Sequence, residues 1–176
     1  MPENSCGCFC GKNKFADFLI KMAATGFFIS YLPPKIFKFK KNTGAGLAGT
    51  IVGLMFVPML PEGNAVYLLF LLGFSLFAVW ISQKASVLIG GETHDDPRIV
   101  IDEIIGYWFA IAFLPKTLEL LIICFVLFRL FDTVKPFFIK KLDSFKGGLG
   151  IVLDDVAAGI AANVLVHLGI KIIRWL

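Results

Sequence analysis

Hydrophobic residues fall in long runs along this 176-residue chain, and short polar stretches separate the runs. The apolar runs occupy residues 46–60, 65–82, 99–114, 118–131 and 149–168. A helix that crosses a bilayer needs about 20 predominantly apolar residues, so 65–82 gives the clearest span and 46–60 is short for one. The pattern predicts an all-α, polytopic membrane helix bundle of about four to five spans.

The segment before these runs is more mixed. Residues 15–32 favour a helix, but Asp17 and Lys21 interrupt it at an i, i+4 spacing. That pairing suits a helix that lies in the membrane interface. Residues 1–14 are polar, and we expect a flexible, cysteine-containing N-terminus. We expect residues 15–176 to form a single membrane-embedded domain.

The composition indicates a membrane protein, and the distribution of charge predicts its orientation in the membrane. Hydrophobic residues make up 57% of the chain, above the roughly 45–50% of soluble domains. Lysines gather before the first long run and in the polar loop 132–148. Cytoplasmic loops carry excess Lys and Arg, so the N-terminus and the loops 83–98 and 132–148 should be cytoplasmic. The turns at 61–64 and 115–117 then lie on the far side. The basic face suits anionic lipid, and no soluble domain exists to present a patch to nucleic acid.

Zinc is not the favoured metal. Cys6, Cys8 and Cys10 form a C-x-C-x-C motif without a nearby fourth ligand, whereas structural zinc sites want four. The chain has two histidines, His94 and His167. His94 adjoins acidic residues and is a candidate ligand or proton carrier, while reduced thiols are the simpler interpretation of the three cysteines.

Acidic residues cluster near the predicted cytoplasmic ends of three spans. The clusters are Asp95, Asp96, Asp102 and Glu103; Asp132; and Asp154 and Asp155. Any one of them is explained by a helix cap or an ion pair. Together they outnumber their basic partners, and ionisable residues within a membrane are functional hypotheses by default. Oxygen ligands suit Mg²⁺, Ca²⁺ or Mn²⁺.

The spacing around the first cluster predicts its local structure. Asp96 followed by Pro97 is typical of a helix cap and a first helical residue. Asp102, Gly106 and Ala110 follow one another at i+4 steps. A stripe of an acid and small residues admits a neighbouring helix at close range.

The last span repeats this design, and a third span brings positive charge. Small or polar residues follow the two acids at i+4 and i+8: Ala158 and Ala162 after Asp154, and Gly159 and Asn163 after Asp155. Arg129, Asp132 and Lys135 are spaced i, i+3, i+6, and Pro136 should end their helix. A metal beside these cations would face an anion, for which phosphate is the obvious candidate.

Three motifs resemble one known family in the same order. They are "DDPRIVIDEIIGYW" (95–108), "FRLFDTVKPFFIKKLD" (128–143) and "GGLGIVLDDVAAGIAA" (147–162). On these residues the chain resembles phosphatidylglycerophosphatase A, a Mg²⁺-dependent bacterial membrane lipid phosphatase. The family's Pro-Gly-Thr-x-Gly-Ser-Leu pattern corresponds to "KNTGAGL" (41–47), where Thr43 and Leu47 agree and Lys41, Asn42, Ala45 and Gly46 depart.

The resemblance implies removal of the terminal phosphate of phosphatidylglycerophosphate, giving phosphatidylglycerol in phospholipid biosynthesis. The expected site lies on the cytoplasmic side of a bacterial inner membrane, and the oligomeric state stays open. The candidate metal ligands, for Mg²⁺, are Asp96, Asp102, Glu103, Asp154 and Asp155. The candidate catalytic residues are Asp102, Glu103, Asp132 and Asp155, and the candidate phosphate-binding residues are Arg129, Lys135 and Thr43.

Two alternatives remain at this stage. One is another membrane lipid-phosphate enzyme, although the chain lacks the Pro-Ser-Gly-His segment of phosphatidic acid phosphatases and the Asp-Gly-x2-Ala-Arg motif of CDP-alcohol phosphotransferases. The other is an ion or proton transporter lined by acids. A transport pathway needs polar groups through the full membrane depth, whereas these acids gather toward one side.

Overall fold

The structure is a computed structural model that describes residues 13–32, 44–89, 96–136, 139 and 147–175. These residues form helices without any strand, which confirms the all-α prediction for this part of the chain. The helices are α1 (Lys14–Ala24), α3 (Ala45–Met55), α4 (Asn64–Ile89), α5 (Ile101–Ala110), α6 (Leu118–Val134) and α8 (Gly148–Trp175). Two 3₁₀ turns, η1 (Ile29–Tyr31) and η2 (Val57–Met59), follow α1 and α3. The predicted flexible segment 1–14 lies almost wholly outside the described residues.

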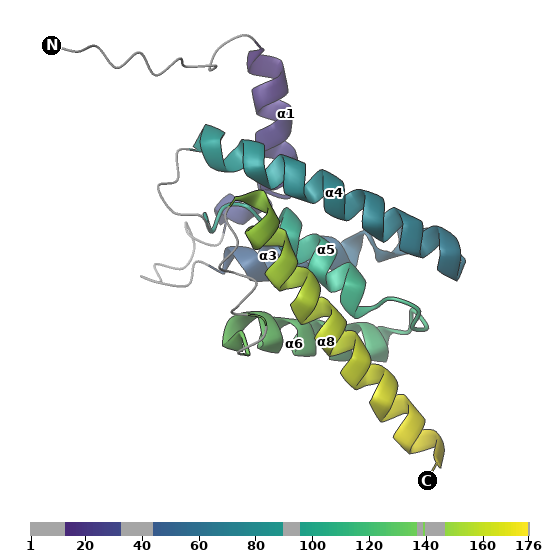
Figure 1. The fold of residues 1–176 in the computed structure, drawn as a ribbon. Helices are drawn as coiled ribbons and strands as arrows, with labels where there is room; N and C mark the ends of the chain where they lie inside the picture. The colour runs from purple at the N-terminus through teal and green to yellow at the C-terminus, as the bar shows by residue number, and fades with distance from the viewer. Residues whose placement is uncertain (1–12, 33–43, 90–95, 137–138, 140–146, 176) are drawn as a thin grey trace, which may run out of the picture.

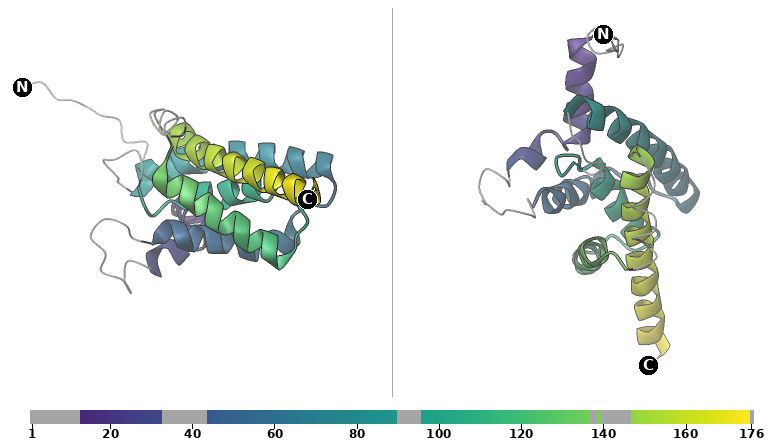
Figure 2. Two further views of the ribbon diagram at one scale, coloured as in Figure 1. Left: turned by 90° about the horizontal axis from the view of Figure 1, so that it is seen from below. Right: turned by 60° about the vertical axis from the view of Figure 1, so that its left-hand side comes forward.

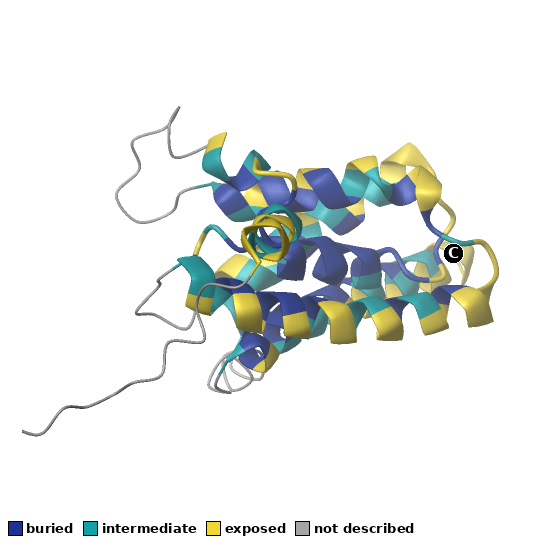
Figure 3. Cartoon of the chain, turned by 90° about the horizontal axis from the view of Figure 1, so that it is seen from above, coloured by how far each residue is buried: buried dark blue, intermediate teal, exposed yellow. Residues whose placement is uncertain are grey.

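Helix α5 forms the centre of the molecule. It packs most extensively against α8 and also contacts α3, α4 and α6, as Figure 1 shows. Of its ten residues, eight are buried, and Figure 3 shows buried backbone at the centre with exposed positions on the outer helices. The ten-residue apolar run of α5 is therefore explained by burial inside protein.

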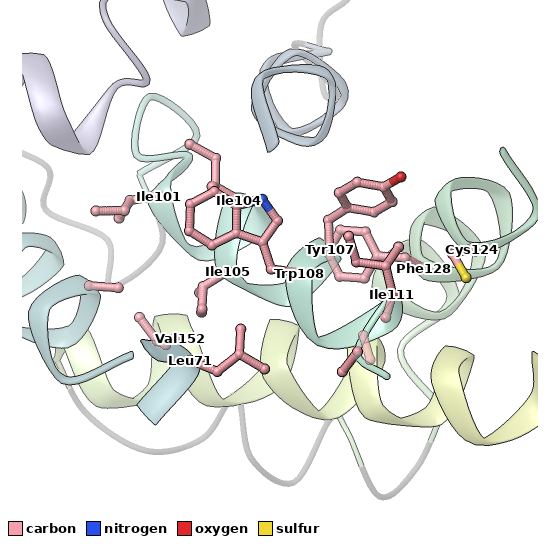
Figure 4. Packing of buried hydrophobic residues seen from close by; sticks show 14 of the residues in the cluster. Leu71, Ile101, Ile104, Ile105, Tyr107, Trp108, Ile111, Cys124, Phe128 and Val152 are labelled. Carbon is pink, nitrogen blue, oxygen red and sulfur yellow. The ribbon is translucent and has the colours of Figure 1, made fainter. Parts of the chain in front are cut away.

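The core contains large side chains from four helices. Ile105 and Trp108 of α5 lie close to Leu71 of α4 and Val152 of α8, and Phe128 of α6 lies beside Tyr107 (Figure 4). The buried polar atoms of the aromatic residues have partners. The Trp108 indole donates to the Gly53 carbonyl oxygen at 2.9 Å, and the Tyr107 hydroxyl donates to the Leu121 carbonyl oxygen at 3.0 Å.

Two of the described helices, α4 and α8, are long and apolar enough to cross a membrane. They have 26 and 28 residues, whereas α3, α5 and α6 have 11, 10 and 17. At 1.5 Å per residue, α5 is about 15 Å long, half of the roughly 30 Å hydrocarbon core of a bilayer. The prediction of four to five spans is therefore not confirmed, while a membrane location fits the two long helices.

Large apolar side chains also cover the outside of the long helices. Leu69 and Leu76 of α4 are 70% and 74% exposed, and Ile173 of α8 is 74% exposed. Figure 2 shows the C-terminal part of α8 extending beyond the other helices. Exposed apolar surface of this extent is unusual for a soluble monomer and matches a surface that contacts lipid.

Small residues bring α5 and α8 together, as their i+4 stripes predict. A Cβ atom on Gly159 would clash with the carbonyl oxygen of Gly106. A Cβ atom on Gly106 would lie 2.8 Å from the carbonyl oxygen of Asp155. Asn163, one turn further along α8, donates hydrogen bonds to the carbonyl oxygens of Ala110 and Ala112 at 3.0 and 2.8 Å.

Several predicted helix ends are wrong. Helix α5 begins at Ile101 and not at Pro97, because Val100 donates its backbone N–H to the Ala24 carbonyl oxygen at 2.8 Å. Helix α4 continues to Ile89 through the first half of the predicted loop 83–98. The predicted helix 15–32 ends at Ala24, since the next turn has left-handed φ angles at residues 26–28. Helix α6 ends at Val134, one residue before Lys135, in agreement with the predicted stop at Pro136.

The helices alternate in direction, so the polar features separate to two ends of the bundle. At one end, the turn at 61–64 meets the turn at 115–117, where the Lys116 ammonium donates to the Leu60 carbonyl oxygen at 3.2 Å. At the other end lie the starts of α3, α5 and α8 and the end of α6. This arrangement agrees with the sequence-based prediction that the two short turns share one side.

Candidate active site

Three carboxylates from two helices converge at the end of the bundle away from the short turns. Asp102 and Glu103 lie in the first turn of α5, and Asp155 lies in the second turn of α8. One carboxylate oxygen of each residue lies within 4.8 Å of those of the other two. Asp102 and Asp155 are buried, with exposed fractions of 6% and 4%. We call Asp102, Glu103 and Asp155 the acidic cluster.

The donor set of the acidic cluster fits a hard cation. Carboxylate groups so close to one another repel when ionised, and burial increases that cost. The buried Oε2 atom of Glu103 has no hydrogen-bond partner among the described residues. Oxygen ligands are the ones that Mg²⁺ and Ca²⁺ prefer. The acidic cluster is therefore able to hold a metal ion.

Lys135 and Asp154 form an ion pair beside the acidic cluster. The Lys135 ammonium lies 2.6 Å from Oδ2 of Asp154. Asp154 is buried, whereas the Lys135 side chain is 26% exposed, so the cation is the more accessible member of the pair. Lys135 is placed by the left-handed backbone at the end of α6, where its φ angle is 43°. The structure thus engages Asp154 with a lysine and keeps it outside the three-carboxylate group.

Arg129 and Asp132 form a second ion pair, at the i, i+3 spacing that the sequence shows. The guanidinium lies 2.7 Å from Oδ2 of Asp132, and both side chains are largely buried. A Cβ atom on Gly46 would lie 2.9 Å from the two terminal guanidinium nitrogens and would overlap Oε1 of Glu103. Arg129 and Glu103 therefore meet against the first turn of α3.

At the start of α3, the sequence predicted a site residue at Thr43 but gave no role to Gly46. Gly46 counted there as a departure from the family pattern, and the structure shows that a side chain at this position would have to displace the ends of Glu103 and Arg129. The signal was present in the glycine-rich stretch "TGAGLAG" (43–49), because repeated glycines often mark close approach of backbone to another group. Thr43, the predicted phosphate-binding residue, lies outside the described residues, as do Asp95 and His94.

Asp96 lies apart from the acidic cluster. Its carboxylate accepts hydrogen bonds from the Arg98 side chain at 2.8 and 2.5 Å and from the Arg98 backbone N–H at 3.0 Å. These side-chain hydrogen bonds from Arg98 hold the pKa of Asp96 below its usual value, against the effect of burial. The same residue accepts through its backbone from Ile99 at 2.9 Å. Asp96 therefore stabilises a turn before α5, and three of the five predicted metal ligands are brought together.

The chain matches known proteins over most of its length. The family model for phosphatidylglycerophosphatase A matches residues 22–170. A Haemophilus influenzae protein named phosphatidylglycerophosphatase A is 34% identical over 149 residues, covering 84% of this chain and 86% of that protein. A Bacteroides thetaiotaomicron protein named "Putative phosphatidylinositol-3-phosphatase" is 30% identical over 167 residues, covering 92% of this chain and 98% of that protein. No solved structure matches.

The site and the comparisons agree on the class of the protein. Carboxylates gathered between basic side chains, at one end of an apolar helix bundle, are the site expected of a membrane phosphatase. The chain belongs to the phosphatidylglycerophosphatase A family, and it is accordingly a lipid phosphatase.

Proposed function

We propose that the protein removes the terminal phosphate of phosphatidylglycerophosphate in a Mg²⁺-dependent reaction at the cytoplasmic face of a bacterial inner membrane. The observation that carries the proposal is the acidic cluster, with its three carboxylate oxygens within 4.8 Å of one another, in a chain of this family. The ion pairs of Lys135 and Arg129 lie on the neighbouring end of α6. The substrate is an anionic phospholipid, and the membrane is the medium that presents it.

In this proposal Asp102, Glu103 and Asp155 hold the metal. When bound, Mg²⁺ offsets the charge of the carboxylates and stabilises negative charge on the phosphoryl oxygens. Lys135 and Arg129 bind the phosphate as cations whose positions are fixed by Asp154 and Asp132. A carboxylate of the cluster accepts the proton from the attacking water as a general base, and it returns a proton to the lipid oxygen as the bond from phosphorus to that oxygen breaks. Asp132 orients Arg129 and is a positioning residue.

The B. thetaiotaomicron relative favours a second candidate substrate. Its name refers to a phosphatidylinositol phosphate, and the match covers nearly all of that protein. The two candidates are both phosphate monoesters on the headgroup of an anionic glycerophospholipid. The acidic cluster and the two basic residues are suited to either substrate, because both carry the same phosphate group. The two candidates differ in the alcohol part of the headgroup, so the choice depends on how the protein recognises that part.

The test is phosphate release from a panel of lipid phosphates by the purified protein. The panel contains phosphatidylglycerophosphate, phosphatidylinositol 3-phosphate and phosphatidic acid, each assayed with Mg²⁺, with EDTA, and with Mg²⁺ restored after EDTA. We expect release from phosphatidylglycerophosphate only with Mg²⁺. Faster release from the inositol lipid would favour the second candidate. Full turnover in EDTA would contradict the role given to the metal.

A further inference from the structure

An apolar groove runs between α6 and α8, next to the proposed site. Phe131 lines it from α6, and residues from Ala157 to Leu168 line it from α8. The groove has a volume of about 510 Å³. Its lining on α8 includes two small residues, Ala157 and Ala161, and continues through Leu165 and Leu168 toward the C-terminus.

The groove leads to the polar end of the bundle. Ala157 lies three residues after Asp154 on α8, and Phe131 lies four residues before Lys135 at the end of α6. Side chains at these spacings are neighbours on one helix face. Lys135 and Asp154 are themselves joined at 2.6 Å. One end of the groove therefore lies about one helical turn from an ion pair whose more accessible member is the ammonium group.

The length of the groove fits one leaflet of a membrane. From Ala157 to Leu168, α8 rises about 16 Å at 1.5 Å per residue. The hydrocarbon core of a bilayer is about 30 Å thick, so each leaflet contributes roughly 15 Å. Among the described helices, α8 is one of two that are long and apolar enough to span a membrane. The groove thus runs along such a helix, from the site end, over a length that matches a single leaflet.

We propose that this groove binds one acyl chain of the lipid phosphate substrate while the phosphate contacts Lys135. The inference rests on the proposed function, because it assigns a place to the apolar part of the same substrate. An apolar hollow that stays empty loses dispersion contacts along its walls, and in a membrane the available filler is an acyl chain. Because the surrounding lipid tails are as apolar as the groove, the acyl chain gains no hydrophobic free energy by entering it. The groove instead fixes the position of the substrate relative to the site.

A second copy of the chain is the competing occupant. Ala157 and Ala161 have the small-xxx-small spacing that allows two helices to meet closely. However, Phe131 and Leu165 also line the hollow, and such bulky side chains favour a narrow chain over a helix as its occupant. The cation at one end also complements a phosphate headgroup.

The test narrows the groove and compares substrates of two chain lengths. Ala161→Leu places a larger side chain in the lining of the groove. Ala65→Leu on α4 makes the same change at an exposed position away from it. Hydrolysis of dioleoyl and dihexanoyl phosphatidylglycerophosphate is measured in detergent micelles. We expect Ala161→Leu to lower kcat/KM for the dioleoyl lipid by roughly tenfold to a hundredfold, because a displaced chain misplaces the headgroup. The dihexanoyl lipid and Ala65→Leu should give wild-type values.

A binding measurement separates this inference from the proposed function. Phosphatidic acid with a diazirine in one acyl chain is irradiated in vesicles that contain the protein, and labelled peptides are mapped. We expect label within 157–168, reduced in Ala161→Leu. If Ala161→Leu does not fold, Leu165→Ala removes a wall of the groove, with Leu76→Ala as its matched control, and should reduce labelling in the same way.

Each result decides one of the two claims. Equal hydrolysis of both lipids by wild type and Ala161→Leu, or label absent from 157–168, would overturn the groove assignment. A dimer that dissociates in Ala161→Leu on analytical ultracentrifugation would also overturn it, by assigning the groove to a second copy. Absence of any hydrolysis with strong label in the groove would overturn the proposed function alone.

Discussion

At the residue scale, the acidic side chains near the starts of α5 and α8 and the end of α6 make two kinds of contact. Asp96, Asp132 and Asp154 each contact a basic side chain, namely Arg98, Arg129 and Lys135. Asp102, Glu103 and Asp155 bring their carboxylate oxygens to one another, and of these three Glu103 also lies close to the Arg129 guanidinium. An ion pair explains an acid structurally, whereas a group of buried carboxylates needs a further positive charge. The acidic cluster is therefore the part of the site to test first.

Removing a carboxylate of the acidic cluster should abolish most of the activity without unfolding the protein. We expect Glu103→Gln and Asp155→Asn each to lower kcat by a factor of about 10² or more, a typical contribution of a positioned acid or base, and to weaken Mg²⁺ binding measured by calorimetry. Glu119→Gln, at an exposed position in the first turn of α6, is the matched control. Without Mg²⁺ the two variants should melt no lower than the wild type, because carboxylate repulsion is relieved. Full turnover in both would refute the assignment.

For Asp96 we expect the opposite result, namely a loss of stability without a loss of Mg²⁺ binding, because its partner is Arg98. The pair lowers the pKa of Asp96 in the folded protein, so its contribution to stability is present above the pKa of an unperturbed aspartate, about 3.9. That contribution is lost as the pH falls through the lower folded pKa. Because Arg98 is 39% exposed, the effect should be modest: we expect Asp96→Asn to lower the free energy of unfolding by about 1 kcal/mol at pH 7. The loss should be smaller at pH 4. Mg²⁺ affinity should be unchanged.

The measurement is thermal unfolding of both proteins across that pH range, with Mg²⁺ calorimetry alongside. A loss of Mg²⁺ affinity at unchanged stability would instead place Asp96 in the metal site, as the sequence alone suggested.

At the scale of elements, the sequence predicted contacts better than it predicted ends. The i+4 steps from Asp102 to Gly106 and from Asp155 to Gly159 predicted a closely packing face on each helix, because helical spacing decides which side chains share a face, and the structure brings these two faces together. The start of α5 was not predictable, since it depends on a hydrogen bond between Val100 and Ala24, 76 residues apart. The role of Gly46 was missed for the same reason: its neighbours, Glu103 and Arg129, lie on other helices.

The α5–α8 contact should depend on the absence of a side chain at Gly159. Gly159→Ala places a Cβ atom against the Gly106 carbonyl oxygen, and backbone cannot move as a flexible side chain does. We expect a loss of roughly 1–3 kcal/mol in the free energy of unfolding, the usual cost of overpacking. Because the acidic cluster is built from these two helices, activity should fall as well.

Gly169→Ala provides a control on the same helix. No atom lies within 4 Å of a Cβ built there, so alanine should leave stability unchanged or raise it by about 0.5–1 kcal/mol through its better helix propensity. Melting temperatures in detergent compare the two variants directly. Equal stability of Gly159→Ala and Gly169→Ala would show that the helices do not approach as closely as described.

At the scale of the whole molecule, hydropathy alone does not separate lipid-facing helices from buried ones. Helix α5 is apolar because it lies inside the bundle, with eight of ten residues buried, whereas α4 is apolar because its outer side is exposed. The apolar runs of both helices were therefore predicted from the sequence as membrane spans. The alternating order of the helix ends was predictable, since short turns connect antiparallel neighbours. The depth to which α3, α5 and α6 enter a membrane depends on packing that the sequence does not display.

The orientation of the bundle is the prediction that joins these scales. The lysine distribution predicts that the acidic cluster lies on the cytoplasmic side, and in the structure the turn containing Glu62 lies at the opposite end of the bundle, next to Lys116. Single cysteines at Glu62 and at Lys84, an exposed position near the end of α4, should therefore react from opposite sides. In a background with the native cysteines replaced, a membrane-impermeant maleimide should label Glu62→Cys in intact cells and Lys84→Cys only after permeabilisation. Labelling of Lys84→Cys alone in intact cells would reverse the orientation, and labelling of both would show that α4 does not span the membrane.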